Sequence, residues 1–294
     1  MVQPPPDLAR YDNNDDSDSV GTSLAHQDMS PPDSPSSLRA ASPPPHAPPQ
    51  RLHKPLTRVQ RERTREAWAS PELAAGRSNN ISPRAFHSLR DGTWLQDEAI
   101  HRFLRLLVAR DAFQASLIDA HRPSFVFTSF FMTQLLNMGD LDPTVQGSYS
   151  YSNIQRWSRR VPGQDVFALD KLFLPVNVNR SHWMVIVAFM QEQRIQAYDS
   201  AGATNTRFLQ ATLRYLADEH QRVHNRALPI RDWSLCESTP ATPTQLNGYD
   251  CGVFTCAFID CLLRNDTPTF SQEDMTQYRR WITLSLLENQ LPIG

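Results

Sequence analysis

Three residues in the second half of the chain have the types and local contexts that a thiol hydrolase requires. His182 opens an apolar run, Asp199 ends the next short apolar segment, and Cys251 precedes a third apolar run. A thiol nucleophile needs a base that removes its proton and a third group that holds the base in one tautomer. Cys251 is therefore the candidate nucleophile, His182 the candidate base, and Asp199 the candidate group that orients the imidazole.

The same chemistry needs hydrogen-bond donors where the oxyanion forms, and the segment before Cys251 offers one. Gln245 lies in a Gly-containing loop six residues before Cys251, so its amide is a candidate oxyanion donor. Cys251 itself is predicted to begin a helix, and the positive end of a helix dipole stabilises a thiolate there. Asp250 is interpreted as a residue that positions this loop without taking part in the chemistry.

Taken singly, each of these residues has a simpler explanation. A histidine at a strand end is usually a surface residue, an aspartate after a strand is usually a turn residue, and an isolated buried cysteine usually packs. The other three cysteines, Cys236, Cys256 and Cys261, have no histidine partner in view and receive no role. No Cys or His pairs have zinc spacing, so we expect neither a metal nor a cofactor.

The elements that must position these residues are three closely spaced strands, predicted at 171–178, 182–190 and 194–199. The middle run is apolar without alternation, which is typical of a central strand covered on both faces. If the second and third strands pair antiparallel, His182 and Asp199 lie side by side at one end. A fourth strand is predicted at 232–237.

Helices are predicted around this sheet from the spacing of apolar residues. Thr93 and Gln96 have capping-box spacing ahead of a helix that includes residues 95–108. Residues 139–153 are predicted to form a loop. The remaining helices are predicted at 128–136, 208–216, 251–263 and 276–287. Together the elements indicate a mixed α/β domain with a helical part ahead of the sheet.

Composition changes along the chain. Of the 23 prolines, 12 fall before residue 56, and the first 66 residues contain a single aromatic, Tyr11. Such a stretch cannot bury enough apolar surface to offset the entropy lost on ordering. We therefore expect residues 1–80 to be a disordered Pro/Ser/Asp-rich regulatory or targeting tail, with one short charged helix at 57–68. Residues 81–294 are expected to form the folded domain.

Charge and hydropathy give no indication of a nucleic-acid or membrane partner. The net charge of −2 predicts no strong electrostatic field, so no nucleic-acid partner is expected. The longest uninterrupted apolar stretch, residues 183–190, is too short to span a bilayer, so no membrane insertion is expected.

The local contexts of the candidate residues resemble one family, the ubiquitin-like-protein proteases of the Ulp/sentrin SUMO-specific type. Residues 245–252, Gln-Leu-Asn-Gly-Tyr-Asp-Cys-Gly, match the family's nucleophile loop almost letter for letter. Residues 170–183 resemble the strand leading to its catalytic His-Trp pair, and residues 194–200 the strand ending in its catalytic Asp-Ser. Residues 94–100 are similar to its Trp-Leu-Asn-Asp signature, although Gln96 stands where Asn is usual. The resemblance covers residues 85–290.

This resemblance implies an α+β, papain-like cysteine protease fold with a central mixed or antiparallel sheet flanked by helices. It implies hydrolysis of the peptide or isopeptide bond after the C-terminal Gly-Gly of SUMO, by a monomeric enzyme of the nucleus or nuclear periphery, with the cytoplasm as the alternative. Trp94 and Trp183 would then sandwich the Gly-Gly tail, because a slot between two indoles admits only a chain without side chains. Asp97 would contact a basic residue of the modifier.

Several alternatives remain open at this stage. The same chemistry is compatible with a Rub/Nedd-type modifier or ubiquitin as the substrate. A modifier-binding module that has lost catalysis is a second reading, and a scaffold in which the tail does the work is a third. The two tryptophans also have an ordinary explanation as core packing.

Overall fold

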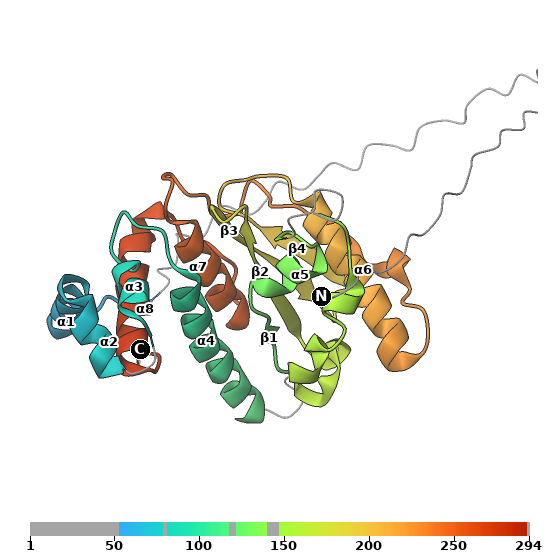
Figure 1. The fold of residues 1–294 in the computed structure, drawn as a ribbon, viewed down its shortest axis with the longest axis horizontal. Helices are drawn as coiled ribbons and strands as arrows, with labels where there is room; N and C mark the ends of the chain where they lie inside the picture. The colour runs from blue at the N-terminus through green and yellow to red at the C-terminus, as the bar shows by residue number, and fades with distance from the viewer. Residues whose placement is uncertain (1–52, 79–80, 118–121, 140–146, 293–294) are drawn as a thin grey trace, which may run out of the picture. The chain divides into compact units, whose positions relative to one another are not determined.

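The computed structural model describes residues 53–78, 81–117, 122–139 and 147–292, and it places a sheet between two layers of helices (Figure 1). The expected disorder of the first 52 residues lies outside the described residues.

The sheet has five strands in the order β1-β2-β3-β4-β5. β1 pairs parallel with β2, β2–β3 and β3–β4 are antiparallel, and β4 pairs parallel with β5. The expected mixed sheet is therefore confirmed. The strands are β1 Phe125–Val126, β2 Lys171–Val178, β3 His182–Phe189, β4 Arg194–Tyr198 and β5 Ser234–Cys236. β1 was not predicted, because two residues are too few to show alternation.

The central strand β3 is buried on both faces, as its unbroken apolar run predicts. Val185 and Val187 point into one hydrophobic cluster, which also contains side chains of α4, α7 and α8. Met184 and Ile186 point into a second cluster, formed with α5 and α6 on the opposite face. Successive side chains of a strand alternate between faces, so a strand between two helical layers needs apolar residues at every position.

After residue 81, five helices of the described chain agree in type and approximate position with the predicted ones. They are α4 Asp97–Leu117, α5 Phe130–Leu135, α6 Thr206–His224, α7 Cys251–Leu263 and α8 Met275–Glu288. A short helix before them, α3 Pro83–His87, was not predicted. Short 3₁₀ helices lie at Tyr151–Asn153, Trp157–Arg160, Pro162–Gln164, Val166–Ala168, Ile230–Asp232 and Gln272–Asp274. The first of these falls inside the predicted 139–153 loop.

The predicted capping box at Thr93 is wrong. The Thr93 hydroxyl donates to the carbonyls of Ser88 and Arg90, both at 2.8 Å, and α4 begins only at Asp97. The backbone N–H of Gln96 donates to the Ser88 hydroxyl at 3.1 Å. The pattern misled because Thr93 closes the preceding turn instead of starting the helix.

Two helices, α1 Arg58–Ala69 and α2 Pro71–Ser78, lie in the stretch assigned above to the tail. Leu56 and Ala67 are buried in the same cluster as α8. The Trp68 indole N–H donates to the Thr283 hydroxyl at 2.9 Å, and Arg63 pairs with Glu288 at 2.5 Å. A few apolar side chains therefore suffice to pack residues 53–78 against the C-terminal helix.

None of the helices in the described part of the chain combines the length and apolar character that crossing a bilayer requires.

Candidate active site

The antiparallel pairing of β3 and β4 brings His182 and Asp199 together. Val185 is opposite Tyr198 in the register, so the start of β3 and the end of β4 share one edge of the sheet. His182 Nε2 lies 2.7 Å from Asp199 Oδ1. The spatial relation predicted from the two strands is therefore present.

Asp199 is 1% exposed and its carboxylate accepts further hydrogen bonds. The Ala201 backbone N–H donates to Oδ1 at 2.8 Å, and the Asn205 side-chain amide donates to Oδ2 at 3.1 Å. Burial raises the pKa of Asp199, but the hydrogen bonds from His182, Ala201 and Asn205 outweigh it and hold the pKa below its ordinary value. The carboxylate is therefore ionised where it meets the imidazole.

The His182 imidazole has partners on two sides. Hydrogen bonds with Asp199 and then with Cys251 raise its pKa to about 9, against the opposing effect of burial. A cation at His182 is the form that favours negative charge on the sulfur it contacts. The arrangement therefore places a protonated imidazole beside the sulfur of Cys251.

Cys251 is the first residue of α7 and is 3% exposed. The next residue, Gly252, packs directly on the segment that carries Trp94. A Cβ at Gly252 would lie 3.1 Å from both the Leu95 Cβ and the Ile100 Cδ1. The absence of a side chain at Gly252 therefore lets the start of α7 approach Leu95 closely.

The Asp250 carboxylate fixes the loop before Cys251. Its Oδ2 accepts from the side-chain amides of Asn247 and Gln272, both at 2.7 Å. Its Oδ1 accepts from Arg279 Nε at 2.8 Å. These contacts support the interpretation of Asp250 as a loop-positioning residue.

Gln245 bridges this loop to the residue after Asp199. Its Oε1 accepts from the Ser200 hydroxyl at 2.7 Å, and its backbone N–H donates to the Ser200 carbonyl at 2.9 Å. Its Nε2 donates to the Asn247 carbonyl at 2.6 Å. A primary amide carries two N–H groups, so a second donor is available at Nε2.

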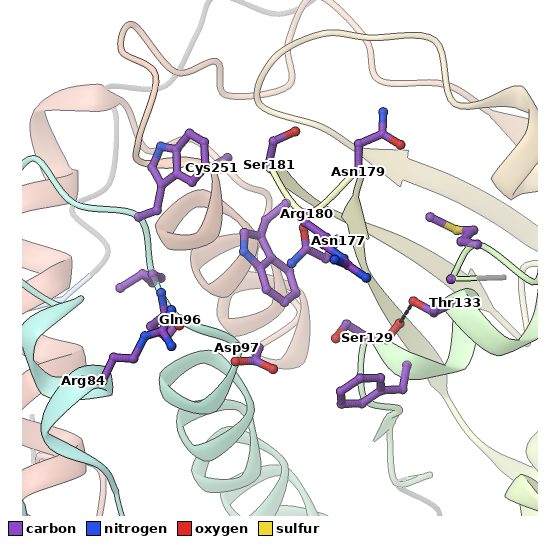
Figure 2. Close-up of a pocket in the computed structure, with 16 residues that line it drawn as sticks. Arg84, Gln96, Asp97, Ser129, Thr133, Asn177, Asn179, Arg180, Ser181 and Cys251 are labelled. Carbon is purple, nitrogen blue, oxygen red and sulfur yellow. Dashed lines mark hydrogen bonds between the residues drawn. The ribbon is translucent and has the colours of Figure 1, made fainter. Parts of the chain in front are cut away.

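A groove of about 810 Å³ runs past Cys251, and it contains the remaining predicted residues, Trp94, Asp97 and Trp183. Trp94 is 51% exposed and its indole N–H donates to the Gly248 carbonyl at 2.7 Å, whereas Trp183 is only 5% exposed. Asp97 lies exposed at the start of α4. Figure 2 shows Gln96 and Asp97 on one side of the groove and Asn177 and Arg180 across from them.

Comparisons with known proteins agree with this geometry. The model of the Ulp1 protease family, C-terminal catalytic domain, matches residues 93–289. The chain belongs to the Ulp1 protease family.

The chain is also similar to individual proteases of this type. The chain is 33% identical over 67% of its length to a sentrin-specific protease of Caenorhabditis elegans, and 29% identical over 69% to human sentrin-specific protease 2. It spans only 26% and 31% of those two proteins. Among solved structures, SUMO protease Ulp1 with its catalytic cysteine oxidised to a sulfonic acid aligns with a TM-score of 0.64 at 26% identity. That alignment covers 82% of this chain and all of the other.

Several groove residues of this Ulp1-family chain were not found from the sequence. Arg84, Ser129, Phe130, Asn177 and Arg180 all line the groove. Arg84 lies in α3, Ser129 and Phe130 at the start of α5, Asn177 in β2 and Arg180 in the β2–β3 turn, so only the tertiary structure brings them to one groove. Asn205, which donates to Asp199, was missed for the same reason.

Two further cysteines of α7, Cys256 and Cys261, are buried. Burial raises the pKa of Cys261 to about 12 and that of Cys256 further still. Both thiols therefore stay protonated near neutral pH, unlike the reactive cysteines of thiol enzymes. Cys236 is half-buried on β5. In the described part of the chain, His, Cys, Asp and Glu side chains form no group of three or more that could hold a metal ion.

Proposed function

We propose that this chain is a SUMO-specific cysteine protease that hydrolyses the peptide or isopeptide bond after the modifier's C-terminal Gly-Gly. The observation that carries the proposal is the placement of His182 between Asp199 and Cys251, at a groove shared by two tryptophans. The relatives named sentrin-specific proteases support SUMO as the modifier. A further solved relative, aligned at a TM-score of 0.63 and 24% identity, is Ulp1 in complex with Smt3, the yeast ortholog of SUMO.

The reaction follows from the positions of the side chains. The Cys251 thiolate, formed by proton transfer to His182, attacks the glycine carbonyl. The second N–H of Gln245 and the Cys251 backbone N–H, which has no intrahelical partner at a helix start, stabilise the oxyanion. His182 donates its proton to the leaving amine, and a thioester forms. Water then attacks the thioester, His182 takes the water's proton, and the Cys251 thiolate leaves.

Trp94 and Trp183 are the proposed walls of the slot for the Gly-Gly tail. Trp183 is fixed by packing, including an edge contact with His101 at 6.4 Å between ring centroids. Trp94 is exposed and hydrogen-bonded to the nucleophile loop. We assign Asp97, exposed in the same groove, to a basic residue of the modifier.

The test is a panel of modifiers with a fluorogenic amide at the C-terminus: SUMO, a Nedd-type modifier and ubiquitin. We expect kcat/KM on SUMO to exceed that on the other two by at least tenfold. If another modifier is hydrolysed faster than SUMO, the proposed mechanism stands and the proposed substrate is wrong. Hydrolysis of none of them would favour a catalytically silent modifier-binding module, which the assembled triad argues against.

We also propose that the protease is monomeric and acts in the nucleus or at the nuclear periphery, with the cytoplasm as the alternative. Residues 81–294 form the catalytic domain and residues 1–80 serve regulation or targeting, and the part of that stretch that forms α1 and α2 also packs on the core of the domain. Imaging of a fluorescent fusion tests the compartment. Deletion of residues 1–52 tests the tail: retained hydrolysis restricts these residues to a role outside catalysis.

A further inference from the structure

Arg279 of α8 is a buried cation outside the candidate triad. It is 1% exposed, and its guanidinium contacts one carboxylate and four backbone carbonyls. The Nε–H donates to Asp250 Oδ1 at 2.8 Å. Nη1 donates to the carbonyls of Ser88 at 3.2 Å and Arg90 at 2.9 Å. Nη2 donates to the carbonyls of Thr93 at 2.7 Å and Tyr249 at 3.1 Å. Only a planar group with five fixed donors can serve this many acceptors.

The acceptors belong to two segments that lie far apart in the sequence. Residues 88–93 lead directly to Trp94, and residues 249–250 lead directly to Cys251. One guanidinium therefore joins the segment that carries the exposed tryptophan to the loop that carries the nucleophile. Gly252 packs against Leu95 in the same region, so the two segments also touch next to these hydrogen bonds.

We propose that Arg279 is a positioning residue for the reaction: it sets the separation between Cys251 and Trp94. The inference rests on the proposed function, because the separation matters only if a tail is held beside Trp94 while its carbonyl meets the sulfur. A displacement of about 1 Å between a held substrate and its nucleophile costs on the order of 100-fold in rate.

A purely structural role predicts a different pattern of effects. If Arg279 served stability alone, its replacement would lower the folded fraction, and every reaction of Cys251 would fall by the same factor. A positioning role predicts that a small reagent, which needs only an accessible thiolate, still reacts. A modifier held by its tail would react much more slowly.

The test compares the full chain with Arg279→Lys, which keeps the charge and loses the planar fork. The measurements are thermal unfolding, the rate of Cys251 alkylation by iodoacetamide mapped by mass spectrometry, and kcat/KM on SUMO with a C-terminal fluorogenic amide. We expect alkylation per folded molecule to stay within about twofold of the wild type. We expect kcat/KM to fall about 10- to 100-fold.

The matched control is Arg280→Lys. Arg280 is the next residue of α8, and its guanidinium lies 5.7 Å from the centroid of the ring of Trp68, which belongs to α1 and to neither of the two joined segments. We expect this variant to retain both rates within about twofold.

A second variant, Asp250→Asn, weakens the contact between Arg279 and residue 250 by changing the acceptor instead of the donor. It tests the positioning role if Arg279→Lys does not fold. The Asn oxygen still accepts a hydrogen bond, but the Asn nitrogen cannot accept those that the second carboxylate oxygen receives, so the two segments are held together less firmly. We expect kcat/KM to fall about 10-fold and alkylation per folded molecule to stay within about twofold of the wild type.

A kcat/KM within twofold of the wild type in these variants overturns the inference, and so does an equal fall in both rates. If the wild type hydrolyses no modifier, the proposed function fails and the inference fails with it. If the wild type is active and the variants match it, only the inference fails.

Discussion

His182 contacts the Asp199 carboxylate on one side and Cys251 on the other, and both contacts raise the pKa of the imidazole. The folded pKa of His182 is about 9, above its ordinary value of 6.5. The stability it contributes is therefore complete below pH 6.5 and is lost as the pH rises through about 9. The folded pKa of Asp199 lies below 3.8, so its contribution is complete above that pH and is lost as the pH falls further.

We predict that Asp199→Asn lowers the free energy of unfolding most between about pH 4 and pH 6.5, and that its cost shrinks towards pH 9. Denaturant titrations of the variant and the wild type at pH 5.5, 7.5 and 9.5 measure this. Asp232→Asn, at an exposed carboxylate outside the site, is the control for a general charge effect. A cost for Asp199→Asn that is constant or grows with pH contradicts the assigned direction.

We predict that replacing the two groove tryptophans has different effects: Trp94→Ala mainly lowers activity, whereas Trp183→Ala lowers stability as well. Trp94 is half exposed, so Trp94→Ala should cost only about 1 kcal/mol of stability, and kcat/KM on the modifier should fall at least tenfold. Trp183 is buried, so Trp183→Ala should cost about 3–5 kcal/mol. Denaturant titration and steady-state kinetics test both variants. Equal stability losses would show that Trp94 is a core residue.

At the scale of elements, the site depends on close packing between the start of α7 and the segment before α4. Gly252→Ala places a Cβ 3.1 Å from the Leu95 Cβ, an atom that cannot swing away. We predict a stability loss of about 1–3 kcal/mol and a fall in kcat/KM.

The matched control is Gly76→Ala in α2. A Cβ there meets nothing within 4 Å, so the substitution should be neutral or stabilising by about 0.5–1 kcal/mol. Thermal unfolding of both variants distinguishes the two effects. A neutral Gly252→Ala would show that α7 and Leu95 have room to separate.

Local patterns were sufficient for β2, β3, β4, α6, α7 and α8, because each is either an apolar run bounded by polar or turn residues or a set of apolar residues at helical spacing. Antiparallel pairing then followed from the short turns, and with it the meeting of His182 and Asp199. β1 was too short to show a pattern. The contacts of Arg279 could not be predicted from local patterns, because its partners lie up to 191 residues away in the sequence. The groove residues outside the motifs depend likewise on tertiary structure.

At the scale of the whole molecule, the packed region begins earlier than composition indicates. Residues 53–78 bury Leu56 and Ala67 against the core, and the His53 ring pairs with the buried Asp260 at 2.7 Å and stacks on Trp281 at 3.8 Å between centroids. The many Arg and Glu residues of α1 made the segment look fully exposed, so its small apolar face could not be recognised from composition.

We predict that a chain beginning at residue 81 is less stable than one beginning at residue 53, by about 3 kcal/mol or more, because the core loses its cover from α1 and α2. Parallel denaturant titrations of the two truncated chains measure the difference. Equal unfolding midpoints would mean that α1 and α2 add no stability.

The account makes one central claim, that Cys251 is a nucleophile directed at a modifier's C-terminal glycine. The most direct measurement incubates the full chain, and Cys251→Ser beside it, with SUMO carrying a C-terminal vinyl sulfone or propargyl amide. We predict a covalent adduct that peptide mapping places on Cys251 and that the serine variant does not form. An adduct of equal yield in the Cys251→Ser variant, or no adduct with SUMO, a Nedd-type modifier or ubiquitin, would contradict the claim.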